Sequence, residues 1–120
     1  MKKTSPPLRR STPAASARSL PEREARAPRE SEIEGAAVRY AKTRDILTVK
    51  MNMAGHRGMP DRLFLRKGRI MFIEFKAPGG KLSARQQYMV RQLNEQRFVV
   101  AVCSSAEVAR SMIDAFFFAE

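Results

Sequence analysis

The feature that most restricts the fold is a pair of apolar segments separated by two turn-forming residues. DRLFLR (61–66) and RIMFIEFK (69–76) are rich in large apolar and β-branched side chains, and Lys67 and Gly68 connect them. A two-residue connection between such segments is typical of a β-hairpin. A hairpin that turns there pairs residues whose numbers sum to about 135, so position 61 lies opposite position 74. The chain must therefore build its sheet around this hairpin.

Helical and extended patterns surround the hairpin. Apolar residues at 33, 36, 37, 40 and 41 follow a helical period, and Ser83 is a candidate N-cap before a second such pattern. In chain order we expect a helix over 30–43, a strand over 45–53, the two hairpin strands, a helix over 83–96, a strand over 97–104 and a helix over 105–117. This order, αβββαβα, predicts an α/β or α+β fold, with a small mixed sheet flanked by helices.

Composition changes near residue 29. Residues 1–29 hold five of the seven prolines, and eight basic residues against two acidic ones, which gives this segment a charge of +6. Such a segment cannot bury enough apolar surface to offset its ordering entropy. We expect a disordered basic arm over 1–29 and one folded domain over 30–120, which carries the remaining +5 of the net +11. The arm either holds nucleic acid or only adds solubility.

The charge and the apolar runs limit the class of protein. A net charge of +11 favours a polyanionic partner, with nucleic acid ahead of an anionic membrane. FVVAVC and AFFF are much shorter than the ~20 residues of a membrane span, and no signal-peptide pattern follows MKK. We expect a soluble, cytoplasmic protein with no membrane contact. Cys103, the only cysteine, has no intrachain disulfide partner and ends an apolar run, which indicates a buried thiol.

Ionisable side chains occupy the end of the hairpin opposite its turn. Side chains two residues apart in a strand share a face, so Glu74 and Lys76 are expected side by side, with Asp61 across the hairpin. Two converging carboxylates repel one another unless a cation bridges them or one stays protonated. Mg²⁺ or Mn²⁺ accepts such oxygen ligands, and the lysine can orient or deprotonate a water. The alternative is an ion pair on an exposed strand, worth ~0–1 kcal/mol.

These residues resemble a known nuclease motif, PD-(D/E)xK. GMPD (58–61) is followed after twelve residues by EFK (74–76), and the run KAPGGKLSARQ (76–86) adds specificity. Over roughly residues 29–105 the sequence is similar to the virus-type replication-repair nuclease (VRR-NUC) domain, especially to its short stand-alone phage and bacterial members. The resemblance implies a restriction-endonuclease-like core with the order αβββαβ, in a bacterial or phage-infected cell.

The resemblance also implies roles for individual residues. Asp61 and Glu74 would be metal ligands, Lys76 the catalytic lysine, and Gln86 a polar residue of the following helix that faces the site. The family has a further acid on its first helix.

That helix acid has several candidates here. Glu30, Glu32 and Glu34 are all available, and the spacing E-x-x-I-E favours Glu30 as the catalytic acid and metal ligand. Glu34 lies one turn later on the same helical face and is the second candidate.

The implied activity is that of an Mg²⁺- or Mn²⁺-dependent, structure-selective DNA endonuclease. Relatives with this pattern cut branched DNA, including four-way (Holliday) junctions of the kind met in DNA repair, and the stand-alone ones are similar to dimeric resolvases. A homodimer with two sites is therefore expected. The alternatives are a nicking or flap nuclease of the same fold and a non-catalytic nucleic-acid-binding module.

Basic residues near the motif are candidates for contact with DNA phosphates, and their alternative is a solvated rim. For the single histidine, a loop position without a role is the alternative. The candidates are Lys50, His56, Arg57, Arg62, Lys81 and Arg85, and Lys67 and Arg69 are expected in the same rim.

Overall fold

The computed structural model describes residues 26–51 and 57–119, so the predicted arm up to residue 25 and His56 lie outside the described residues. The described elements follow the predicted order. They are α2 (Glu30–Thr43), β1 (Leu47–Lys50), β2 (Arg62–Arg66), β3 (Arg69–Phe75), α3 (Ala84–Glu95), β4 (Val99–Cys103) and α4 (Ala106–Phe118).

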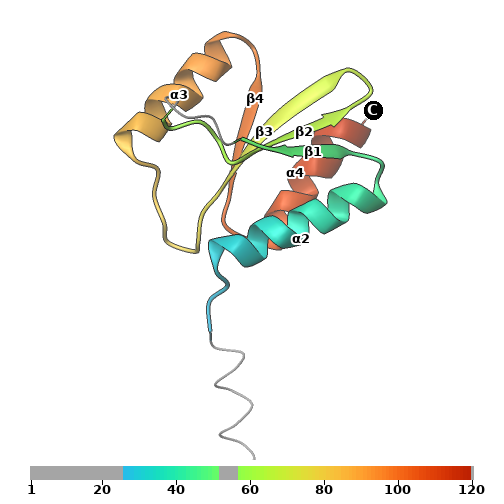
Figure 1. Ribbon diagram of the computed structural model, residues 1–120, viewed down its shortest axis with the longest axis horizontal. Coiled ribbons are helices and arrows are strands. Elements are labelled where there is room, and N and C mark those ends of the chain that lie inside the picture. Colours follow the sequence, from blue (N-terminus) through green and yellow to red (C-terminus); the bar gives the residue numbers. More distant parts are fainter. Residues whose placement is uncertain (1–25, 52–56, 120) are drawn as a thin grey trace, which may run out of the picture.

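The four strands form one mixed sheet in the order β1-β2-β3-β4 (Figure 1). β1, β2 and β3 are antiparallel neighbours, whereas β4 runs parallel to β3 after the α3 crossover. Arg62 pairs with Ile73 and Arg66 with Arg69, which is the predicted register. Lys67 and Gly68 both have positive φ, 51° and 79°, as a two-residue turn of the right twist requires.

The hydrophobic core lies between one face of the sheet and the helices α2 and α4, which lie side by side beneath it in Figure 1. Phe64, Met71, Ile73 and Phe75 point into this layer and are at most 1% exposed. The helices meet them with small and branched residues, chiefly Ile33, Ala37 and Ala41 from α2 and Ala109 and Ile113 from α4. Small residues let the helices approach the sheet closely, which fixes the position of α2 over β1 to β3.

α3 differs from the other two helices because none of its described residues is buried. It begins at Ser83 as predicted, with the Ser83 hydroxyl accepting a hydrogen bond from the Gln86 amide N–H. Its packing against the sheet is mainly with β4. The predicted apolar stripe is therefore only partly covered, and Tyr88 remains 42% exposed.

Element ends differ slightly from the prediction. β1 ends at Lys50, and Met51 follows it with one backbone hydrogen bond to Asp61. α4 extends to Phe118, and its last aromatic rings do not share one face: Phe117 is buried, whereas Phe116 and Phe118 are half-buried. Arginine side chains stack on these two rings, with Arg44 lying 4.1 Å from the Phe118 ring centre. Within the described residues, no helix is long and apolar enough to span a membrane.

Candidate catalytic site

The end of the β2–β3 hairpin opposite the turn gathers the predicted acid, acid and lysine. Asp61 lies directly before β2, and its Oδ2 accepts a hydrogen bond of 2.9 Å from the backbone N–H of Phe75. Glu74 is the only buried charged residue of the described chain, at 3% exposed. The Lys76 Nζ lies 3.3 Å from Glu74 Oε2, so the two side chains do share a face. The predicted grouping is present.

Gln86 reaches this group from the first turn of α3. Its side-chain amide donates a 3.0 Å hydrogen bond to Glu74 Oε2. Its carbonyl Oε1 accepts from the backbone N–H of Ser83 at 2.8 Å, while the Ser83 hydroxyl accepts from the Gln86 N–H. Both ends of the amide are thus assigned, and the helix cap fixes which end faces Glu74. This role of Ser83 was not predicted, although its capping position was.

The two carboxyl groups disfavour one another's charge. Burial raises the pKa of Glu74, the charge of Asp61 raises it further, and Lys76 partly offsets both. Burial also raises the pKa of Asp61, against the hydrogen bond from Phe75, and the charge of Glu34 adds to the rise. A positive charge placed between these groups would therefore stabilise their ionised forms.

The donor atoms fit a hard divalent cation. Glu74 Oε1 is buried without a hydrogen-bond partner among the described residues, although the other oxygen has two. An orphaned carboxylate oxygen costs free energy unless something binds it. The described residues contain no group of three acidic, His or Cys side chains that could hold a metal ion. Glu74 and Asp61 would therefore supply two ligands, with water and phosphate completing the shell.

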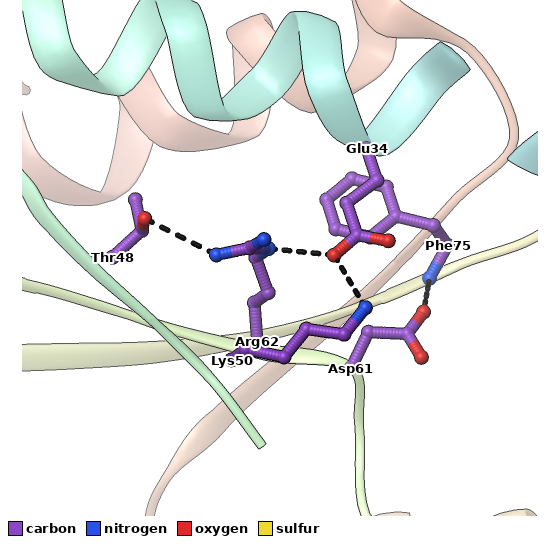
Figure 2. Close-up of polar contacts among 6 residues, drawn as sticks. All are labelled: Glu34, Thr48, Lys50, Asp61, Arg62 and Phe75. Atoms are coloured by element: carbon purple, nitrogen blue, oxygen red, sulfur yellow. Dashed lines mark hydrogen bonds and ion pairs between the residues drawn. The ribbon is translucent and has the colours of Figure 1, made fainter. Parts of the chain in front are cut away.

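Glu34 is held by two basic residues, as Figure 2 shows. Its Oε2 accepts from Arg62 Nε at 2.6 Å and from Lys50 Nζ at 2.8 Å, and Arg62 also reaches the Thr48 hydroxyl. Burial alone would raise the pKa of Glu34, but these two hydrogen bonds and charges lower it overall. The pairs join α2 to β1 and β2. Opposite charges far apart in sequence gave no signal for this partnership.

Glu30 lies one turn before Glu34 at the start of α2. Its charge contributes to the raised pKa of both Asp61 and Glu74, which places it within electrostatic reach of the two carboxylates. The charge of Glu34 contributes only at Asp61. Both candidates for the helix acid thus face this end of the sheet, and the choice of Glu30 stays a prediction.

A cavity of about 660 Å³ opens beside the group, lined by Arg57, Gly58, Met59, Ser83, Arg85 and Gln86. Arg85 donates from Nε to the Arg57 carbonyl, so this wall is tied to the loop before Asp61. Gly58 has φ +84°, and a Cβ there would lie 2.7 Å from the Arg85 carbonyl oxygen. This close approach explains why glycine stands before Met59-Pro60-Asp61.

The predicted basic rim is only partly assembled. Arg57 and Arg85 border the cavity, and Lys81 is exposed in the segment before α3. Lys50 and Arg62 are engaged by Glu34 rather than free. The expectation for Lys67 and Arg69 was wrong, because they flank the hairpin turn at the other end of β3, about 20 Å away at ~3.3 Å per residue.

Comparison with known proteins agrees with this geometry. The family description "VRR-NUC domain" matches residues 15–107. A solved structure titled "VRR_NUC domain" superposes with a TM-score of 0.67 at 23% sequence identity, covering 73% of this chain and 97% of that one. This likeness shows that the two share a fold. No curated protein matches the chain.

Proposed function

The chain belongs to the VRR-NUC domain family of nucleases, and on that premise we propose that it is a metal-dependent endonuclease that cuts branched DNA as a homodimer. The nuclease chemistry follows from the family. The metal, the DNA shape and the assembly are the proposed part. The observation that carries the proposal is the Glu74 carboxylate, which is buried, held on one oxygen by Lys76 and Gln86, and unpartnered on the other.

Each side chain has a distinct task in this proposal. Asp61 and Glu74 would hold a divalent cation, Mg²⁺ or Mn²⁺, whose chemistry when bound is to neutralise phosphate charge and acidify a water. The Phe75 N–H fixes the Asp61 carboxylate, and Gln86 fixes that of Glu74. Lys76 lies against Glu74 and can orient the attacking water or move its proton. Glu30, or Glu34 after release from its basic partners, adds a further acid.

DNA is the expected substrate because the family acts on nucleic acid and the chain carries a net charge of +11. Arg57 and Arg85 border the cavity beside Gln86, where a phosphate backbone could enter. Branched DNA is favoured over a linear duplex by the resemblance to short stand-alone members. A four-way junction also presents two equivalent bonds to a two-fold enzyme.

A cleavage assay on matched four-way, flap, nicked and linear DNA, each with Mg²⁺ and with Mn²⁺, tests the proposal. We expect the junction to be cut fastest and no cleavage with EDTA. Asp61→Asn and Glu74→Gln should both abolish cleavage while leaving the melting temperature of the metal-free protein unchanged or higher, because each removes a charge that burial disfavours. A preference for flaps or nicks would replace the junction with those substrates. Full activity of both variants, or activity in EDTA, would overturn the metal site.

A further inference from the structure

One face of the sheet is apolar and largely uncovered. We define the open face as the eight apolar side chains that point away from α2 and α4. By register they form two rows across the strands, the first Leu47, Leu65 and Ile70, and the second Val49, Leu63, Phe72 and Val100, followed by Val102 beside Glu74. Antiparallel sheets often leave one face to water, but that face is then polar. Here it is not.

The described elements cover this face only near β4. Phe98 packs edge-on against Phe72, with ring centres 5.7 Å apart, and α3 packs mainly on β4. At the opposite edge, Leu47 is 64% exposed and Val49 41% exposed. A hollow of about 340 Å³ over Leu47, Leu65 and Ile70 continues to the hairpin turn. Side chains of this size are normally exposed singly, not as a contiguous surface on four strands.

The rest of the chain has little that could cover the open face. Residues 1–25 contain only Met1, Leu8 and Leu20 as large apolar residues, among seven prolines-and-basic positions that favour water over a sheet. A nucleic acid is also a poor occupant, since its phosphates require cations and the eight side chains offer none. The occupant must therefore bring a complementary apolar surface of its own.

We propose that the open face is the contact through which a second copy of this chain packs, face to face, across a two-fold axis. Four strands ~4.8 Å apart and three side-chain rows ~6.7 Å apart give a surface of roughly 400 Å². This is about half of the ~800 Å² that each partner of a standard interface buries, and it corresponds to the apolar centre of such an interface. The polar rim would supply the rest. A self-complementary patch is what a two-fold contact requires.

This contact would also set the distance between two catalytic groups. Phe72, Glu74 and Lys76 alternate along β3 onto the same side, so the open face leads directly into the site. Pairing two open faces therefore holds two copies of the site in one fixed relation, which a branched substrate with two equivalent bonds needs. In this respect the inference rests on the proposed function, but the contact itself rests on the sheet face.

Sedimentation of the full chain, without DNA or metal, tests the contact. We expect a dimer that Leu47→Lys and, separately, Val49→Lys convert to a monomer, because each buries a charge at the centre of the contact. Val108→Lys and Met112→Lys are matched controls, since both residues are similarly exposed, at 47% and 39%, but lie on α4. The controls should stay dimeric, and circular dichroism and melting should show all four variants folded. A monomeric wild type, or a dimer that neither open-face variant weakens, would overturn the proposal.

Salt gives a second measurement. Each copy carries a net charge of +11, so an apolar contact between copies should persist or strengthen as salt screens their repulsion. A dimer that dissociates as salt rises would point to a polar contact elsewhere and would also overturn the proposal. These readouts do not involve cleavage. An inactive but dimeric protein would reject the proposed nuclease and keep the contact, whereas an active monomer would reject only the contact.

Discussion

The two faces of β3 show how one strand serves stability and chemistry at once. On the side covered by α2 and α4, Met71, Ile73 and Phe75 are at most 1% exposed and touch only apolar neighbours. On the other side, Phe72 is followed by Glu74, whose charge is disfavoured by burial and by Asp61. The first face gains free energy from burial, whereas the second spends part of it to hold an acid ready. Substitutions on the two sides should therefore fail in different ways.

α2 belongs to both sides of this comparison, and it gives the largest expected effect. Ile33 anchors the helix in the core, while Glu30 and Glu34 lie toward the chemical end. We expect Glu30→Gln to be inactive and Glu34→Gln to be only weakened, because Glu30 is within electrostatic reach of both Asp61 and Glu74. Single-turnover cleavage rates with Mg²⁺ measure this ranking.

Melting temperatures provide the control for that pair. Glu34→Gln should also lower stability, since Lys50 and Arg62 lose a charged partner, whereas Glu30→Gln should not. If instead Glu34→Gln is the inactive variant, the motif acid lies one turn further along α2.

The covered face should show its effect in stability. Ile73→Ala is expected to cost ~2–5 kcal/mol of unfolding free energy, because it leaves a cavity in a fully buried layer. Leu47→Ala on the open face should change it by less than ~0.5 kcal/mol, because Leu47 is already 64% exposed. Urea unfolding at protein concentrations low enough to give monomers measures both. Equal losses would mean that the open face is covered within a single copy.

The sequence predicted the hairpin well because its information is local. The turn at Lys67-Gly68, the pairing of position 62 with 73 and the cap at Ser83 each depend on a few adjacent residues, and all are present. The Asp61, Glu74 and Lys76 grouping followed from that register. What the sequence did not reveal depends on packing between distant elements. The capture of Glu34 by Arg62 joins residues 28 apart, and only the fold brings them together.

Two wrong expectations have the same origin. Lys67 and Arg69 are near the motif in sequence but lie beyond the turn, so a strand length separates them from Glu74. The apolar stripe of α3 follows a helical period, but periodicity does not say how much sheet the helix will find to cover. The roles of Lys81 and of His56, which lies outside the described residues, stay predictions.

Lys76→Ala should separate chemistry from folding on the second face of β3. Loss of a positioned proton-transfer group is expected to slow cleavage ~10²-fold, while DNA affinity stays within a few-fold. Lys76 side-chain loss leaves Gln86 as the remaining partner of Glu74 Oε2, so the fold should survive. Cleavage rates and fluorescence anisotropy with junction DNA measure the two quantities. Full activity would remove Lys76 from the mechanism, and loss of binding equal to the loss of rate would reassign it to substrate contact.

The smallest effect is expected at Cys103, which lies on the covered face at the end of β4 and pairs with Phe75. Burial raises the pKa of this thiol from 9.0 to about 11. The native state therefore keeps its proton while the unfolded state loses it, and stability should fall as pH rises from about 9 through 11. At pH 8 the native thiol should resist alkylation and react only as the chain unfolds. Cys103→Ala provides the control, because its stability should lack this decline above pH 9. A thiol that reacts rapidly in the native protein would show that the covered face opens at the end where Glu74 and Lys76 lie.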